Sequence, residues 1–224
     1  YQGFEISGFV HLGTGLISGA KIADLQKVGV ETTIFLADWH SWINDKLGGD
    51  IEVIKNVALN YFAEALKKSI EVMGGDPTKT KFILGSDLYH NNDEYWQLVI
   101  KISKNVTLSR MLRSITIMGR KMRESVPFAW LLYPAMQVAD IFILNVNIAH
   151  AGLDQRKAHV IAIELGEKIA NYTPIALHHH LILGLQSPPK WPLTPEEAKQ
   201  IWSDMKMSKS IPDSCIFIHD SPQE

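Results

Sequence analysis

Two lysines flank small polar residues in the segment Lys206-Met207-Ser208-Lys209-Ser210, near the end of the chain. Ammonium, hydroxyl and backbone N–H groups placed together can bind a polyphosphate. Near the beginning, His11-Leu12-Gly13-Thr14 opens a helical pattern, and a helix N-terminus attracts anions. Each segment alone has a simpler interpretation, as a solvated lysine pair or a helix-capping histidine. In this order and this far apart, they indicate a nucleotide held between the two segments.

A second group of polar residues shares one face of a predicted helix. Tyr133, Gln137 and Asp140 are spaced at i, i+4 and i+7, which places them on the same side of a helix. A phenol, an amide and a carboxyl group do not form a core stripe, so this face predicts the wall of a polar pocket. For Asp140 alone a helix cap or a surface carboxylate is the commoner role, but its apolar neighbours Val138 and Ile141 favour burial.

The hydrophobic pattern indicates the elements that position these residues. Apolar runs alternate with helical patterns, which is typical of a mainly parallel α/β sheet. The predicted strands are residues 1–4, 31–37, 81–84 and 173–177. The predicted helices are residues 13–28, residues 51–73 and a helix that begins at Asp154. With 224 residues, of which 46% are hydrophobic, the chain can bury one full core.

Composition and charge exclude several classes of protein. The formal net charge of −2 argues against a generally basic nucleic-acid binder, so any RNA contact must be local. Cys215 is the only cysteine, which excludes an intrachain disulfide and fits a cytoplasmic location. No apolar run is long enough to cross a membrane, and no signal peptide is visible. Because the chain begins at Tyr1 rather than at a methionine, we expect a fragment that is truncated at both ends.

One stretch of the chain is locally basic. Residues 101–123 contain no acidic side chain, and their basic residues are Lys101, Lys104, Arg110, Arg113, Arg120, Lys121 and Arg123. A solvated helical face is the simpler interpretation of such a charge run, and a contact with nucleic acid is the alternative.

Four segments together resemble a known family. Residues 11–14 and 206–210 resemble the HIGH and KMSKS signatures of class I aminoacyl-tRNA synthetases. Residues 132–140 and 151–157 are similar to the amino-acid pocket segments of archaeal and eukaryotic-type tyrosyl-tRNA synthetases. The second signature matches in every letter, whereas Thr14 stands where the family usually has a second histidine. A hydroxyl can still donate to phosphate but carries no charge, so the departure implies slower activation or a catalytically silent relative.

The resemblance covers essentially the whole chain and implies its organisation. The implied fold is a Rossmann-like parallel sheet flanked by helices, with a helical connective insertion. Residues 1–97 and 131–200 would form the two halves of the catalytic domain. Residues 98–130 would be the insertion, with the dimer contact and the contact to the tRNA acceptor end. Residues 201–224 would carry the KMSKS loop and the start of a linker to an anticodon-binding domain that is missing from this chain.

The implied reaction is that of a tyrosine–tRNA ligase. L-tyrosine would be activated by ATP to tyrosyl-adenylate with release of pyrophosphate, and then transferred to the 3′ end of tRNA(Tyr). Mg²⁺ is expected as a companion of ATP, held largely by phosphates and water rather than by a metal site of the protein. The implied partners are L-tyrosine, ATP, tRNA(Tyr) and a second copy of the chain in a homodimer, with no membrane.

The resemblance also implies roles for single residues. The residues expected at the reacting phosphates are His11, Thr14, Lys206 and Lys209. The residues expected to bind tyrosine are Tyr1, Tyr133, Gln137, Asp140 and Gln155. Further lining of this pocket is expected from Glu5, Phe35, Ala37 and His40. The residues expected to bind ATP are Gly13, Gly152, Asp154, Ser208 and Lys209. Within the pocket, Asp140 and Tyr1 would pair with the phenol hydroxyl, and phenylalanine would leave both unpaired.

Other functions stay open at this point. Tryptophan–tRNA ligases share the fold and the motif order, although an indole offers no hydroxyl to Asp140 and Tyr1. Thr14 is compatible with a non-catalytic relative that binds RNA or protein, and other nucleotidyltransferases share a motif like the first signature. The run of histidines at 178–180 suggests a metal, but adjacent strand residues point to opposite faces, so histidines near the nucleotide are the better interpretation.

Overall fold

Five parallel strands form the sheet in the part of the chain that the structure describes. The computed structural model describes residues 1–119, 125–186, 192, 194–195, 205–207, 209, 211–221 and 223. One group of strands has the order β1-β2-β3, and a second group pairs β4 with β5. The strands are β1 (Gln2–Glu5), β2 (Thr32–Ala37), β3 (Thr80–Leu84), β4 (Ile148–Gly152) and β5 (Ile175–His179).

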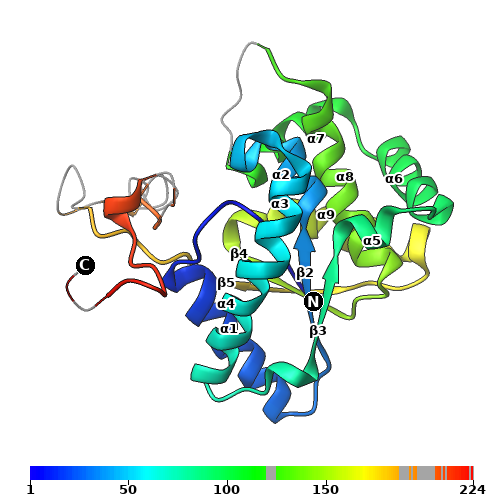
Figure 1. Cartoon of the computed structure of the whole chain (residues 1–224). Helices are drawn as coiled ribbons and strands as arrows, with labels where there is room; N and C mark the ends of the chain where they lie inside the picture. The colour runs from blue at the N-terminus through cyan, green and yellow to red at the C-terminus, as the bar shows by residue number, and fades with distance from the viewer. Residues whose placement is uncertain are drawn as a thin grey trace.

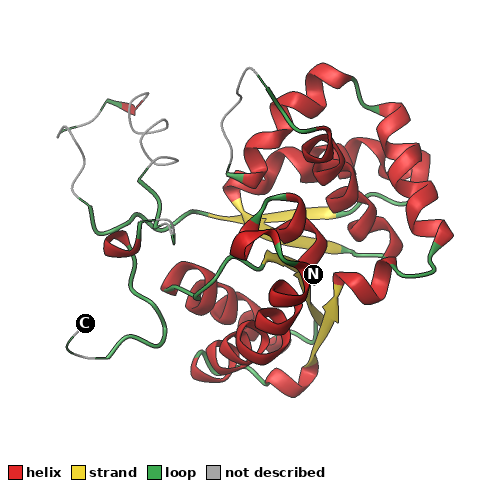
Figure 2. Cartoon of the chain, turned by 45° about the horizontal axis from the view of Figure 1, so that its top comes forward, coloured by secondary structure: helices red, strands yellow, loops and turns green. Residues whose placement is uncertain are grey.

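The backbone of Tyr1 joins the two groups of strands. Its terminal amino group donates to the carbonyl oxygen of Ile148 at 3.0 Å, and its own carbonyl accepts from the N–H of His150 at 2.8 Å. β1 and β4 are therefore neighbours, and the five strands follow the order β3-β2-β1-β4-β5. This is the Rossmann-like sheet flanked by helices that the sequence predicts (Figure 2).

Alternate residues of β2 face two different layers of helices, as the twofold period of a strand requires. Ile34 and Leu36 pack with one apolar cluster, whereas Phe35 and Ala37 pack with another. Both faces of β2 are thus covered, which explains why its residues from Ile34 to Ala37 form a continuous apolar run.

The first layer consists of α1 (Leu12–Lys27) and the predicted long helix at residues 51–73. That helix is present as three consecutive segments, α3 (Ile51–Val57), a π-helical turn η2 (Ala58–Phe62) and α4 (Ala63–Val72). The Asp50 carboxylate caps α3 by accepting from the N–H groups of Glu52 and Val53. The extent of the helix is confirmed, and the π-turn within it was not predicted.

The second layer contains α8 (Phe128–Ile143), α9 (Arg156–Ala170) and α6 (Asp93–Asn105) (Figure 1). α8 carries the predicted polar face, because Tyr133, Gln137 and Asp140 all lie on it. The shorter elements around this layer are α2 (Asp38–Ile43), α5 (Gly85–Tyr89), α7 (Leu108–Ser114) and the 3₁₀ turns η4 (Ile115–Met118) and η5 (Leu153–Gln155). Further 3₁₀ turns are η1 (Lys46–Gly49), η3 (Pro77–Lys79) and η6 (Pro212–Ser214).

The predicted insertion at residues 98–130 packs into the same core as α8. Leu98, Ile102 and Met111 belong to the apolar cluster that contains Ala139 of α8. Arg110 of the basic stretch forms an ion pair with Glu164 of α9. Arg120, Lys121 and Arg123 lie outside the described residues. The domain limits given above remain predictions.

The segment after the second signature lies beside the start of α1 (Figure 1). The N–H of Leu12 donates to Ile216 O at 3.0 Å, and the N–H of Ile218 donates to Val10 O at 3.0 Å. These backbone bonds bring the two signature motifs, which are almost 200 residues apart in the sequence, to one end of the molecule.

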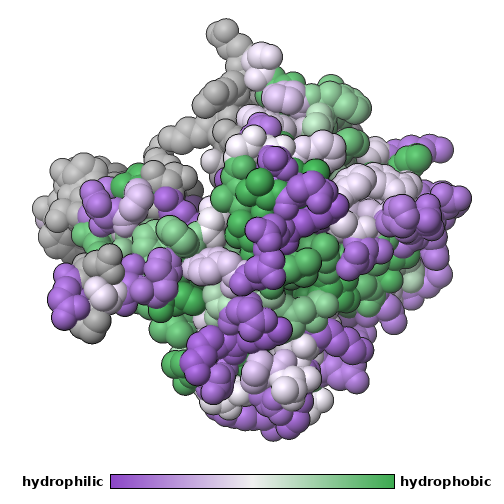
Figure 3. Space-filling view, viewed as in Figure 1, coloured by the Kyte–Doolittle hydropathy of each residue, from purple (hydrophilic) through white to green (hydrophobic). Residues whose placement is uncertain are grey.

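The outer surface mixes hydrophilic and hydrophobic side chains. On the face in Figure 3, hydrophilic residues are interspersed with smaller apolar areas. Exposed apolar residues such as Val53 and Leu59 stand near charged ones such as Glu52 on the same helical segment. Among the described residues, no helix combines the length and the apolar character that crossing a membrane requires.

Gly19 marks the closest approach between α1 and α4. A Cβ placed on Gly19 would stand 2.6 Å from the backbone oxygen of Ser69 in α4. We therefore predict that Gly19→Ala lowers the free energy of unfolding by about 2 kcal/mol, because the overpacking outweighs the gain in helix propensity. Ala20→Gly in the same helix is the control and should cost only about 1 kcal/mol. Denaturant unfolding measures both, and a Gly19→Ala variant as stable as the parent would contradict this packing.

Candidate functional site

A cavity of about 650 Å³ opens at the carboxyl edge of the sheet, between the ends of β1 and β4. Parallel strands end at one edge, and ligands of such sheets bind where neighbouring strands lead to helices on opposite faces. The cavity is lined at the ends of successive strands by Glu5, Ala37, Gly152 and His179. Both signature motifs also contribute, through His11, Gly13, Thr14, Lys206 and Lys209.

One end of the cavity holds a buried carboxyl group. Asp140 of α8 lines the cavity but is only 1% exposed, and burial raises its pKa well above the usual range. The hydroxyl of Tyr89 donates to Asp140 Oδ1 at 3.0 Å, and His40 Nε2 lies 3.7 Å from Oδ2. Burial lowers the pKa of His40 to about 3, so its ring is neutral. Asp140 thus sits among neutral polar groups and aromatic rings.

Tyr1 lines the same end of the cavity. Its ring packs against Phe35 with 5.8 Å between the centroids, and burial, followed by the nearby Asp140, raises the pKa of its hydroxyl. Phe35 itself is fully buried and is absent from the cavity lining, so its predicted role is corrected from wall to support behind Tyr1. Ala37 and His40 do line the cavity, as predicted.

Sequence reasoning missed Tyr89 as a partner of Asp140. It follows β3 within the short helix α5, and its ring packs against Phe35 and Trp39. A signal was present, since polar residues cluster directly after the predicted third strand. The sequence could not show that the Tyr89 hydroxyl reaches Asp140, because the two residues are 51 positions apart and meet only in the folded structure.

The preceding turn of α8 and the turn η5 carry the two glutamines of the prediction. Gln137 Nε2 donates to Gln155 Oε1 at 3.3 Å, and Gln155 Nε2 donates to the carbonyl oxygen of Ile117 at 2.9 Å. Gln137 Oε1 is buried and has no hydrogen-bond partner among the described residues. A buried acceptor without a partner is costly, so this oxygen is suited to a ligand N–H group.

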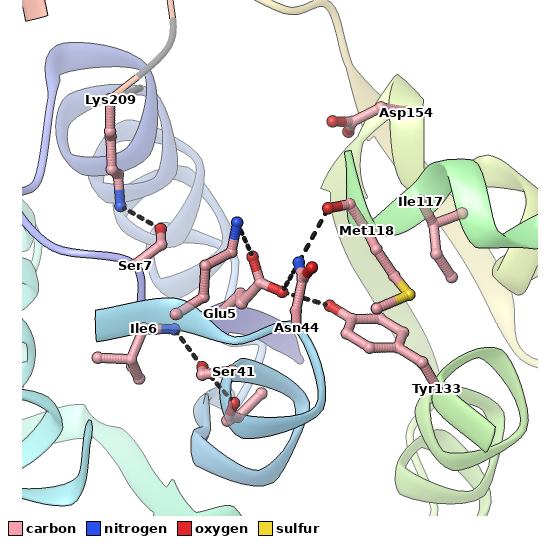
Figure 4. A network of polar contacts seen from close by, with 12 residues as sticks. Glu5, Ile6, Ser7, Ser41, Asn44, Ile117, Met118, Tyr133, Asp154 and Lys209 are labelled. Atoms are coloured by element: carbon pink, nitrogen blue, oxygen red, sulfur yellow. Dashed lines mark hydrogen bonds and ion pairs between the residues drawn. The ribbon is translucent and has the colours of Figure 1, made fainter. Parts of the chain in front are cut away.

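Glu5 organises the middle of the cavity (Figure 4). Its Oε1 accepts from Asn44 Nδ2 at 2.6 Å and from the Tyr133 hydroxyl at 3.4 Å, and Lys46 Nζ lies 3.4 Å from Oε2. Asn44 also donates to the carbonyl oxygen of Met118 at 2.9 Å. The hydroxyl of Tyr133 therefore gives its proton to Glu5 and keeps its oxygen free to accept from a ligand. Asn44 and Lys46 were not predicted, because their loop carries no motif.

His11 is the N-cap of α1. Its Nδ1 accepts from the N–H of Gly13 at 3.1 Å, and burial, with Lys209 and Lys206 nearby, lowers its pKa to about 4. The ring is then neutral with its proton on Nε2, which lies 3.2 Å from Thr14 Oγ1. The His11 Nε2–H therefore donates to Thr14 Oγ1, which leaves the Thr14 hydroxyl free to donate at a helix N-terminus, and this suits an anion.

The two lysines of the second signature reach the cavity from different directions. Lys206 Nζ donates to Asp154 Oδ2 at 2.8 Å. Lys209 Nζ donates to Ser7 Oγ at 3.1 Å and lies 5.0 Å above the ring of Phe62 (Figure 4 shows the Ser7 contact). Burial lowers the pKa of Lys209 to about 8, against the opposing effect of Glu5. Ser208 lies outside the described residues.

Gly13, Gly152 and Asp154, which the resemblance implies as ATP-binding residues, all line the cavity in the structure. A Cβ on Gly152 would stand 2.7 Å from Asp154 Oδ1 and 2.8 Å from Leu181 Cδ2, so a larger residue would collide with both side chains. Within the described part of the chain, no group of three or more histidine, cysteine, aspartate or glutamate side chains is arranged to hold a metal ion.

Comparison with known proteins places this site in a family context. A model of the family described as tRNA synthetases class I (W and Y) matches residues 1–224. The tyrosine–tRNA ligase of Thermococcus kodakarensis is 66% identical over 234 aligned residues, which include 100% of this chain and 62% of that protein.

Solved structures are similar over nearly the whole chain. The crystal structure of tyrosyl-tRNA synthetase from Pyrococcus horikoshii complexed with L-tyrosine has a TM-score of 0.96 and 64% identity, and the match covers 100% of this chain and 62% of that one. The tryptophanyl-tRNA synthetase from Aeropyrum pernix K1 has a TM-score of 0.70 and 22% identity, with 99% of this chain and 54% of that one covered, and shares the fold. The chain thus spans less than two thirds of the length of these relatives.

Proposed function

The chain belongs to the class I tRNA synthetases of the tryptophan and tyrosine group, and we propose that it acts as a tyrosine–tRNA ligase. The observation that carries the proposal is the buried carboxyl group of Asp140, with Tyr1 near it in the lining of the cavity. A phenol hydroxyl placed there donates to one group and accepts from the other. The tyrosine–tRNA ligase relatives and the L-tyrosine in the Pyrococcus horikoshii structure support this substrate.

The α-ammonium group at the other end of the amino acid would lie near hydrogen-bond acceptors of the cavity. The α-ammonium group has three N–H donors, and the free Oε1 of Gln137 and the hydroxyl oxygen of Tyr133 can each accept one. Glu5 keeps the Tyr133 hydroxyl in this orientation and supplies negative charge nearby. Tyrosine is thereby held at both ends, with its carboxylate directed toward the region between the two signature motifs.

Activation requires the tyrosine carboxylate to attack the α-phosphorus of ATP, with pyrophosphate as the leaving group. Negative charge increases on the phosphates, so positioning and positive donors provide most of the catalysis. The Thr14 hydroxyl would donate to a phosphate oxygen, and the His11 Nε2–H would do so on turning from Thr14 to ATP, while Lys206 and Lys209 would stabilise the leaving pyrophosphate. Mg²⁺ would arrive with ATP, bound by its phosphates and water, and would neutralise part of their charge.

The proposal also includes transfer of the tyrosyl group to tRNA, the oligomeric state of the protein and its location in the cell. The 3′ end of tRNA(Tyr) would enter the cavity from the side of residues 98–130, whose basic side chains suit a phosphate backbone. Following the family resemblance, we also propose a homodimer and a cytoplasmic location.

Amino-acid-dependent ATP–pyrophosphate exchange tests the proposed substrate. We predict exchange with tyrosine and far less with phenylalanine or tryptophan, because these leave Asp140 and Tyr1 unpaired. Asp140→Asn should lower kcat/KM for tyrosine about 10²-fold, since its amide offers the phenol one acceptor and a competing donor. Asp93→Asn, at the exposed start of α6, is the matched control and should change nothing. Exchange with tryptophan would overturn the choice of substrate, and folded protein without exchange would indicate a silent relative.

The lowered pKa of Lys209 leads to a prediction for the alkaline side of the pH profile of kcat/KM for ATP. Its lowered pKa means that the ammonium charge is complete below pH 8 and is lost as the pH rises through about 8. We predict that kcat/KM for ATP falls about tenfold per pH unit above this value, because the free enzyme then lacks the charge that binds pyrophosphate. Lys209→Arg stays charged and should lose this limb, whatever its maximal rate. A falling limb that is the same in Lys209→Arg would show that another group titrates.

A further inference from the structure

A buried carboxyl group near Asp140 takes no part in the proposed reaction. Asp38 follows β2 as the first residue of α2, is fully buried, and is absent from the residues that line the cavity. Its Oδ1 accepts from the N–H groups of Trp39 and Ser86, each at 2.9 Å. Its Oδ2 accepts from the hydroxyl of Ser86. Both oxygens are thus hydrogen-bonded, which offsets the cost of burying a carboxylate.

Asp38 joins the short helices α2 and α5. The helix α5 begins at Gly85, and its N-cap residue Leu84 has no side-chain oxygen that could accept from the first N–H groups of the helix. Asp38 supplies this acceptor from the end of the neighbouring strand β2. The indole N–H of Trp39 in α2 also donates to the Ser86 hydroxyl, at 3.0 Å. These hydrogen bonds hold the two helices in one relative position.

Each of the two helices carries one of the neutral groups that face Asp140. Tyr89 is the last residue of α5 and donates to Asp140 Oδ1 at 3.0 Å, while His40 Nε2 of α2 lies 3.7 Å from Oδ2. The hydroxyl of Tyr89 also lies 3.4 Å from His40 Nδ1. The relative position of α2 and α5 therefore determines how both groups meet the carboxyl group of Asp140.

Tight packing connects the Asp38 carboxylate to the ring of Tyr89. A Cβ built on Gly85 would stand 2.6 Å from Asp38 Oδ1 and 3.1 Å from Tyr89 Cε2, so no side chain fits between them. The ring of Trp39 packs edge-on against Tyr89, with 5.4 Å between the centroids. The Tyr89 ring thus packs between the start of α5 and Trp39, and the hydrogen bonds of Asp38 and Ser86 hold both.

From this arrangement we propose that Asp38 and Ser86 are positioning residues for the discrimination of tyrosine from phenylalanine. They hold α5 so that the Tyr89 hydroxyl keeps the carboxyl group of Asp140 in one orientation toward the substrate phenol. Without this hold the carboxyl group can rotate, and the hydrogen bond that only tyrosine forms becomes weaker. The inference rests on the proposed function, which places the phenol of tyrosine at Asp140.

Substitutions of the two residues remove this hold in steps. Ser86→Ala removes the hydroxyl but keeps the backbone N–H that donates to Asp38. Asp38→Asn is the conservative variant, because its amide oxygen can accept from both N–H groups while its NH₂ group donates to the Ser86 oxygen. Asp38→Ala removes all of these bonds. Asp87→Ala is the matched control, because Asp87 is an exposed carboxylate in the same helix α5.

The experiment measures kcat/KM for tyrosine and for phenylalanine in ATP–pyrophosphate exchange, and compares the ratio of the two values between variants. We expect Ser86→Ala to lower this ratio about fivefold and Asp38→Ala about tenfold, because only tyrosine loses part of a hydrogen bond. Asp38→Asn and Asp87→Ala should keep the ratio within about twofold of the parent. The KM for ATP should stay at the parent value in every variant.

A double-mutant cycle shows whether the effect passes through Tyr89. Tyr89→Phe alone should lower the ratio about tenfold, because Asp140 then loses its donor. Adding Ser86→Ala to Tyr89→Phe should change the ratio by less than about twofold, since nothing is left for Ser86 to position. The full loss from Ser86→Ala in this background would contradict the inference.

The outcomes separate this inference from the proposed function. A parent protein without tyrosine-dependent exchange would contradict the proposed function itself. If the parent prefers tyrosine and folded Ser86→Ala keeps the parent ratio, Asp38 and Ser86 do not position the phenol site. Thermal unfolding of each variant is measured alongside, because a purely structural role would lower stability and leave the ratio unchanged. If Asp38→Ala does not fold, Ser86→Ala and the cycle with Tyr89→Phe decide the question.

Discussion

The pairing of Tyr1 with β4 is the constraint on which the rest of the structure depends. Two backbone hydrogen bonds join the strands β1-β2-β3 to β4-β5, so helices leave the sheet toward opposite faces on either side of this junction. The space between them is the cavity, and the ends of β1 and β4 form its floor. The same residue, Tyr1, also places its hydroxyl at the closed end of the cavity. The fold and the proposed substrate recognition thus both depend on one residue.

The polar groups of the cavity are held by other polar groups before any substrate arrives. Tyr89 orients Asp140, Glu5 orients Tyr133, and the cap on α1 selects the tautomer of His11. Burial makes each unpaired group costly, so these bonds limit the side chains to few orientations. Such preorganisation suits a reaction in which the protein mainly positions a carboxylate against a phosphate.

Much of the fold follows from local sequence patterns. The strands β1, β2, β3 and β5 and the long helix were predicted to within about two residues of their bounds in the structure. β4 was missed, because Ile148 is its only β-branched residue and small residues flank His150. The π-turn η2 was also missed, since its five residues continue the pattern of the helix on both sides.

The site residues could be predicted where they belong to a sequence motif or share one face of a predicted helix. The structure brings the polar face of α8, both signature motifs and Glu5 to one cavity. Tyr89, Asn44 and Lys46 were not predictable, because their roles depend on how loops and helices cross in space. Phe35 was expected in the cavity wall, but it lies two residues farther from the end of β2 than Ala37, on the same face and behind the ring of Tyr1, and this depth could not be seen in the sequence.

The most direct measurement of the central claim is a crystal structure of the protein with L-tyrosine bound. We expect the phenol oxygen within hydrogen-bond distance of both Asp140 and the Tyr1 hydroxyl, and the ammonium group at Gln137 Oε1 and the Tyr133 hydroxyl. A tyrosine bound in the reverse direction, with its ammonium group at Asp140, would contradict the proposed basis of substrate selection.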